Sequence, residues 1–263
     1  MVWLTYLLVG SLSGLLAGLF GIGGGLVIVP VLNYWFAWSS SPIPADARMH
    51  FAIGTSLAVI IFTAVSSLRA HHRRGAVLWP AVVRLVPGVL FGGLAGAALA
   101  DAMSNDLLQR VFGFFVVAIA IQMILNRRPE AGSSLPGVVG FALAGFVIGA
   151  VSALAGIGGG LLTVPFLLWR SVGMREAVGS AAACTFPVAV AGATGFVISG
   201  WDTGATVAGA TGYVFWPAVL GIAMASVLTA PLGAQLAHAL PVARLRSAFA
   251  VFLVIVGVKM LLF

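Results

Sequence analysis

The sequence predicts an all-α polytopic membrane protein made of two inverted repeats of about five helical segments, the first helix of each repeat broken at a glycine cluster. Three observations predict this class. The 263 residues are 61% hydrophobic and only 7% charged, which lies outside the range of soluble globular domains. The apolar residues form long runs instead of alternating patterns, so helices are favoured over a membrane barrel. One glycine-rich pattern also occurs twice, once in each half of the chain.

The duplicated pattern places four glycines within five residues, followed by a leucine and, five positions beyond the cluster, a proline. Four glycines leave the backbone uncovered and permit positive φ angles. Such a stretch is costly in lipid unless it lines something polar, so an interruption of the helix is expected. The two copies are Gly21-Ile22-Gly23-Gly24-Gly25 with Leu26 and Pro30, and Gly156-Ile157-Gly158-Gly159-Gly160 with Leu161 and Pro165.

The hydrophobic runs and the polar breaks between them define the segments in order. In the first half they are 3–20 and 26–38, on either side of the glycine cluster, then 51–68, 77–100 and 107–125. In the second half they are 135–154, 161–169, 177–199, 213–237 and 248–262. The linker 131–134 separates the halves, so the first repeat is expected over 1–131 and the second over 132–263, within one membrane domain.

The positive charges decide between parallel and inverted halves, because short cytoplasmic loops collect Lys and Arg. If each half crosses four times, the arginines in the connections divide five inside and six outside. If each half crosses five times, the halves are inverted and only Arg48 and Arg110 lie outside. The nine on the inside are then Arg69, Arg73, Arg74, Arg127, Arg128, Arg170, Arg175, Arg244 and Arg246. This bias favours the inverted arrangement, with both termini extracytoplasmic, and explains the net charge of +7 without a nucleic-acid partner.

The glycine clusters are the first candidate for binding a substrate. A glycine run before a helix exposes backbone N–H groups at the positive end of the helix dipole, which binds anions without a charged side chain. The alternative is close helix packing through small residues. Pro30 and Pro165 have an expected structural role, because each removes a backbone donor and bends its helix. The candidate substrate-binding glycines are Gly21, Gly23, Gly24, Gly25, Gly156, Gly158, Gly159 and Gly160.

Polar side chains within the apolar segments form the second candidate set. They are Asn33, Thr55, Ser56, Thr163, Ser180, Cys184 and Thr185, which could donate hydrogen bonds to an oxyanion. Hydroxyl groups in membrane helices also bond to their own backbone one turn away, so both interpretations stay open. Arg84 lies about seven residues into its segment, where a fixed cation could balance a bound anion or reach the membrane interface with its long side chain.

Other chemistry finds little support in the sequence. Cys184 is the only cysteine, and the spacing of His71 and His72 suits no metal motif, so no metal or cofactor is expected. The segments contain no acidic residue, which excludes an intramembrane carboxylate pair and argues against an enzyme.

The two glycine-leucine-proline motifs, together with Ala52-x-Gly54-Thr55-Ser56 and Ala177-x-Gly179-Ser180, resemble the TauE/SafE family of bacterial sulfite and organosulfonate exporters over the whole chain. The resemblance implies a secondary transporter in the inner membrane that exports a small sulfur-containing anion. Alternating access, with the anion between the two glycine-broken helices, is the expected mechanism. The expected partners are therefore a small anionic substrate and the lipid bilayer.

Two other functions stay open at this point. An anion channel for the same substrate would be distinguished by a current far above carrier rates. A membrane enzyme or assembly partner acting on sulfur metabolites would change its substrate chemically. Ser180-Ala181 stands where the first half has Thr55-Ser56, so the halves are expected to contribute unequally to a ligand.

Overall fold

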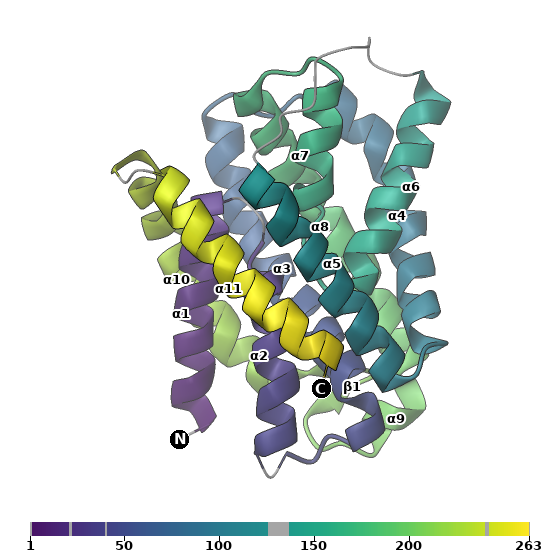
Figure 1. Ribbon diagram of the computed structural model, residues 1–263. Helices are drawn as coiled ribbons and strands as arrows, with labels where there is room; N and C mark the ends of the chain where they lie inside the picture. Colours follow the sequence, from purple (N-terminus) through teal and green to yellow (C-terminus); the bar gives the residue numbers. More distant parts are fainter. Residues whose placement is uncertain (1, 21–22, 40, 126–136, 240–241, 263) are drawn as a thin grey trace.

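The computed structural model describes residues 2–20, 23–39, 41–125, 137–239 and 242–262, and its regular structure is almost entirely helical (Figure 1). The elements of the first half are α1 (Val2–Phe20), α2 (Gly25–Trp38), the 3₁₀ turn η1 (Ala45–Ala47), α3 (Arg48–Arg73), α4 (Trp79–Asp101) and α5 (Asn105–Leu125). Those of the second half are α6 (Val138–Leu154), α7 (Gly160–Trp169), α8 (Met174–Ser199), α9 (Trp201–Ala205), β1 (Ala210–Thr211), β2 (Val214–Phe215), α10 (Trp216–Ala239) and α11 (Val242–Leu262).

Helix lengths match a membrane-spanning bundle. Among the described residues, five helices are long and apolar enough to cross a membrane, judged by length and composition. They comprise α3 with its preceding turn, α4, α5, α8 and most of α10. α2 has 14 residues and α7 has 10, so they extend only about 21 and 15 Å along their axes. The predicted all-α polytopic membrane fold is confirmed, with short helices following both glycine clusters.

The two halves pack against each other through four pairs of helices. α1 packs along α10, and α4 packs along α6. α3 packs against α8 and α5 against α11, which lie side by side across the front of Figure 1. The repeat pairs α1 with α6, α3 with α8, α4 with α10 and α5 with α11. If each helix is replaced by its predicted repeat equivalent, the α1 to α10 contact becomes the α4 to α6 contact and the reverse. The contacts between α3 and α8 and between α5 and α11 are unchanged by this replacement.

The centre of the bundle is formed by α3 and α8. All residues from 51 to 60 on α3 are buried, which requires a segment that is apolar or hydrogen-bonded on every face. The outer helices instead expose large apolar side chains, such as Phe91, Phe114 and Leu228 at 70%, 71% and 74%. An exposed apolar surface of this kind is stable when lipid covers it.

Glycines allow the closest helix contacts. Gly88, Gly92 and Gly96 lie one turn apart on α4, and each lies against a backbone carbonyl of α6. A methyl group at any of the three would overlap that carbonyl, which belongs to Ala142, Phe146 or Ala150. Small residues at four-residue spacing bring membrane helices together in this way. A share of the 34 glycines therefore serves packing.

The segment that enters α10 differs from the expectation. The sequence predicts helix from residue 213, which is wrong for 213–215. Ala210–Thr211 pairs antiparallel with Val214–Phe215, and Gly212 has a φ of +55° in the turn between them. α10 begins only at Trp216. A two-residue strand is too short to leave a periodic pattern in the sequence.

α3 is longer at its C-terminal end than expected. It continues beyond residue 68 to Arg73 and so includes most of the basic cluster. Positive side chains in the last turn interact favourably with the free carbonyls of a helix, which explains why the helix continues through these polar residues. The expected boundary between the repeats, at 131 and 132, lies outside the described residues.

Candidate functional site

The two glycine clusters, far apart in the sequence, touch each other in the structure. A methyl group on Gly23 would lie 3.4 Å from both Cα and N of Gly158. A methyl group on Gly25 would overlap the carbonyl oxygen of Gly156 and lie 2.9 Å from Cα of Ile157. The breaks therefore lie against each other, and at Gly25 a side chain would prevent this close approach.

The backbone conformation at the breaks also requires glycine. Gly23, Gly24 and Gly156 have φ angles of +75°, +76° and +62°. Residues with a Cβ atom adopt this left-handed region only at an energetic cost, and β-branched residues are strained most. Each break is thus a sharp turn of the chain that ends one helix and starts the next. Gly21 lies outside the described residues.

Free backbone donors gather at the start of α7. The carbonyl of Gly159 accepts from the N–H groups of Leu162 and Thr163. Earlier in the same turn, no acceptor within the described residues takes a hydrogen bond from the N–H of Gly158, Gly159, Gly160 or Leu161. Such donors remain free at every helix start unless a cap binds them. Here they lie at the contact between the two breaks, at the positive end of the α7 dipole.

Three of the candidate hydroxyl groups surround the second break. Ser56 on α3 donates a hydrogen bond of 2.8 Å to the carbonyl of Gly156. Thr163 donates to the carbonyl of Gly159 at 2.7 Å. Thr185 donates to Ala181 within α8 at 3.0 Å, and its methyl group faces Gly158. All three are buried, and each hydroxyl hydrogen is engaged by a backbone carbonyl.

Thr55 and Ser180 serve a different contact. Thr55 accepts a hydrogen bond from the N–H of Phe215, at 3.0 Å. Ser180 accepts one from the N–H of Leu78, at 2.9 Å. Phe215 directly precedes α10 and Leu78 directly precedes α4, so each hydroxyl holds the segment that enters one of these helices in the opposite half.

Asn33, Cys184 and Arg84 are not brought to the contact between the breaks. Asn33 donates to the side chain of Gln109 at 2.9 Å and ties α2 to α5. Cys184 is a buried free thiol on α8. Arg84 is exposed on α4, with its guanidinium 5.9 Å from the ring centroid of Phe141. A role of these three side chains toward a ligand at the breaks would require another conformation.

Sequence reasoning missed Ser152, in the last turn of α6. Its side chain is completely buried, and its hydroxyl oxygen has no hydrogen-bond partner among the described residues. Its backbone carbonyl accepts from the N–H of Ile157, at 3.0 Å, and so shapes the break. A buried polar atom without a partner is unusual and calls for an explanation. The available signal was a serine four positions before the second glycine cluster in an otherwise apolar segment.

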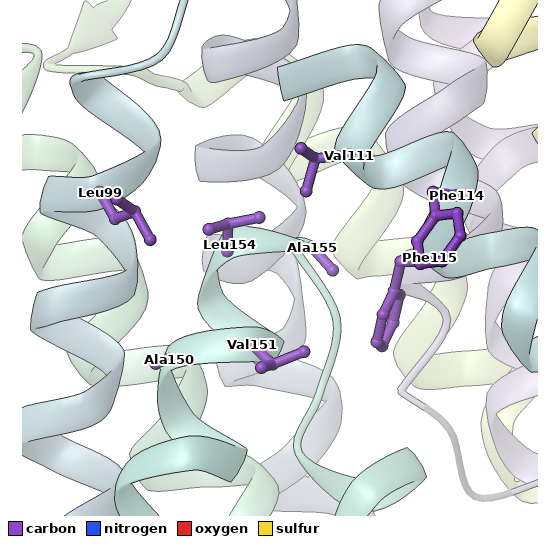
Figure 2. A pocket seen from close by; sticks show the side chains of 8 residues that line it. All are labelled: Leu99, Val111, Phe114, Phe115, Ala150, Val151, Leu154 and Ala155. Carbon is purple, nitrogen blue, oxygen red and sulfur yellow. The ribbon is translucent and has the colours of Figure 1, made fainter. Parts of the chain in front are cut away.

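A pocket beside the end of α6 is unsuited to an anion. It encloses about 260 Å³ between α4, α5 and α6. Figure 2 shows only carbon side chains around it, including Phe114, Phe115 and Leu154. Burying an ion there without polar partners would be highly unfavourable. The free N–H groups at the breaks are the better chemical match for an oxyanion.

The chain matches the family described as Sulfite exporter TauE/SafE over residues 6–260. A probable membrane transporter protein of Haemophilus influenzae is 38% identical over 264 residues, with 98% of each protein covered. Probable membrane transporter protein MJ0441 of Methanocaldococcus jannaschii is 27% identical over 258 residues, which cover 97% of this chain and 94% of the relative. No solved structure matches the chain.

Proposed function

Because the chain belongs to the TauE/SafE family of sulfite exporters, we propose that it is a secondary transporter that exports a small sulfur-containing anion, sulfite or an organosulfonate. The coarser function follows from the family and its relatives: the chain is a membrane transporter and not an enzyme. The observation that carries the proposed site is the contact between Gly23 and Gly158.

Electrostatics favours an anion at this contact. α2 and α7 both begin there, so the positive ends of two helix dipoles approach each other. Two such ends repel, and each corresponds to roughly half an elementary charge. A small oxyanion between them would accept hydrogen bonds from the free N–H groups of the second break. Its negative charge would also offset the repulsion between the two helix ends. The Ser152 hydroxyl, which has no partner among the described residues, can donate to the anion. The hydroxyls of Ser56, Thr163 and Thr185 would complete the proposed ligand set by turning away from their present carbonyl partners.

Alternating access requires this contact to open. At the Gly23 to Gly158 contact a single methyl group on Gly23 would already reach van der Waals contact with Gly158, so an anion fits only when the two breaks separate. Rocking of one repeat against the other would expose the anion to one side of the membrane and then to the other. The packed arrangement is accordingly assigned to a closed step of the cycle.

The repeats, 1–131 and 132–263, are proposed to be inverted about an axis in the membrane plane. Three features support this: the exchange of helix contacts between the halves, the arginine bias, and the course of the helices in Figure 1. There the first residues of α1 and the last of α11 lie toward the same end of the molecule, while α2 and α7 extend toward opposite ends. Both termini are assigned to the extracytoplasmic side of the bacterial inner membrane.

Counterflow in proteoliposomes tests the function. Vesicles preloaded with unlabelled sulfite, sulfoacetate or thiosulfate are diluted into the labelled anion, and label that accumulates unchanged identifies a carrier substrate. We expect saturable exchange of sulfite or sulfoacetate. If none of the three exchanges above protein-free vesicles, the assignment to sulfur anions is wrong. A current far above carrier rates under the same conditions would instead indicate a channel.

A further inference from the structure

A second pocket, away from the glycine breaks, combines one cation with an apolar and aromatic lining. It has a volume of about 560 Å³ and lies between the outer half of α2 and the end of α11. Lys259, the one lysine of the sequence, supplies its charge. The α2 residues that line it are Val31, Tyr34, Trp35, Ala37 and Trp38.

Lys259 and Tyr34 form the polar part of the pocket. The Lys259 ammonium lies 4.3 Å from the centroid of the Tyr34 ring, which places the charge over an aromatic face. The Tyr34 hydroxyl is buried and has no hydrogen-bond partner among the described residues. Because that hydroxyl is closed off from the pocket, the donor suited to a phosphate group is the Lys259 ammonium.

The exposed Trp38 beside the pocket favours a position near a membrane interface. Trp38 ends α2 and is 90% exposed, and exposed tryptophans concentrate at the level of the lipid headgroups. The repeat relates Tyr34 to Trp169, and Trp169 also carries a cation, with Arg170 5.0 Å from its ring. The outer ends of both short helices thus present a cation over an aromatic ring, but Lys259 belongs to an open pocket.

We propose that this pocket binds the phosphate of an anionic phospholipid. Lys259 would hold the phosphate with its ammonium placed by the Tyr34 ring, and Val31, Trp35 and Trp38 would contact the apolar part of the lipid. A free oxyanion would leave these apolar walls uncovered, whereas a phospholipid joins one anionic group to a long apolar body. The charge and the lining together therefore match an amphipathic ligand, and this site is independent of the transported substrate.

Native mass spectrometry tests the proposal. The full chain in detergent is mixed with increasing concentrations of phosphatidylglycerol or phosphatidylcholine, and the lipid that stays bound after release from detergent is counted. We expect phosphatidylglycerol to bind preferentially. Lys259→Gln should weaken its binding about fivefold, the effect expected for one basic residue at a membrane surface. Lys259→Arg should retain the preference. Arg110→Gln, which removes an exposed cation from α5 outside the pocket, is the matched control and should bind like the unmodified chain.

Three results would overturn the lipid site. Equal binding of both lipids would show that the charge of Lys259 does not select the lipid. Unchanged phosphatidylglycerol binding in Lys259→Gln would place the lipid elsewhere. Displacement of phosphatidylglycerol by inorganic phosphate or sulfite would assign the pocket to a free anion. Thermal melting of each variant verifies that it is folded. Tyr34→Leu, which removes the ring that faces the Lys259 ammonium, provides a second variant expected to weaken phosphatidylglycerol binding selectively.

Discussion

The hydroxyl of Thr55 on α3 accepts a hydrogen bond from the backbone N–H of Phe215, 160 residues away in the sequence and 3.0 Å away in space. Its counterpart in the repeat is the bond from Leu78 to Ser180. Each half therefore uses the hydroxyl of its repeated Ala-x-Gly-Thr/Ser pattern to hold the other half. In the predicted repeat the two bonds occupy equivalent positions, and they join the halves at two separate places.

Removing either acceptor should destabilise the protein. In Thr55→Val the buried N–H of Phe215 loses its partner, and an unsatisfied buried donor costs about 1–3 kcal/mol. Ser180→Ala should act in the same direction at Leu78, while Thr55→Ser should keep the bond. Thermal melting of purified protein in detergent provides the measurement. Thr206→Val is the control, because that hydroxyl bonds to Thr203 in an exposed loop. Wild-type melting of both Thr55→Val and Ser180→Ala would show that the bonds contribute nothing.

The glycine before each hydroxyl should be equally sensitive. A methyl group on Gly54 would lie 2.6 Å from the carbonyl oxygen of Tyr213, and one on Gly179 would overlap the carbonyl of Ala76. Both neighbours are backbone and cannot rotate away, so Gly54→Ala and Gly179→Ala should each cost about 1–3 kcal/mol, as overpacking does. Gly137→Ala enters open space and should melt like the unmodified protein. If all three alanine variants melt alike, the close approach is not required.

The sequence was sufficient to predict the long helices and the two glycine breaks. Long apolar runs and duplicated glycines are local signals, so both short helices were placed within about one residue of their observed starts, at Gly25 and Gly160. The contact between Gly23 and Gly158 could not be predicted in the same way, because it depends on how the two halves pack. Correspondence in a repeat does not specify which residues meet.

The roles of single polar residues were the least predictable. Thr55 and Ser56 are neighbours in the sequence, yet one holds Phe215 and the other holds Gly156 at the break. Their side chains leave α3 in different directions, and only the packed structure supplies the partners. Ser152 was missed for a related reason. The hydroxyl of a lone serine in an apolar helix normally bonds to its own backbone, whereas the Ser152 hydroxyl has no partner among the described residues.

Substitutions at the breaks should separate transport from folding. Gly23→Val places a β-branched residue at a φ of +75°, and in Gly158→Val the new Cβ would lie 2.6 Å from the methyl group of Thr185. We expect both variants to insert into the membrane and to lose anion counterflow. Gly173→Val is the matched control, since the nearest atom to its Cβ is the Glu176 carboxylate at 3.7 Å. Wild-type counterflow in both break variants would contradict the backbone anion site.

Cysteine labelling can test the inverted topology with little background, because the native Cys184 is buried. In the proposed arrangement the exposed Asp202 on α9 lies outside the cell and the exposed His72 at the end of α3 lies inside. A membrane-impermeant maleimide added to intact cells should therefore label Asp202→Cys and should label His72→Cys only after the membrane is permeabilised. The unmodified chain should remain unlabelled in both conditions. Because these positions lie in different repeats, accessibility of both from the same side, outside or cytoplasmic, would favour parallel halves. Labelling of His72→Cys alone would reverse the assigned orientation of the whole bundle.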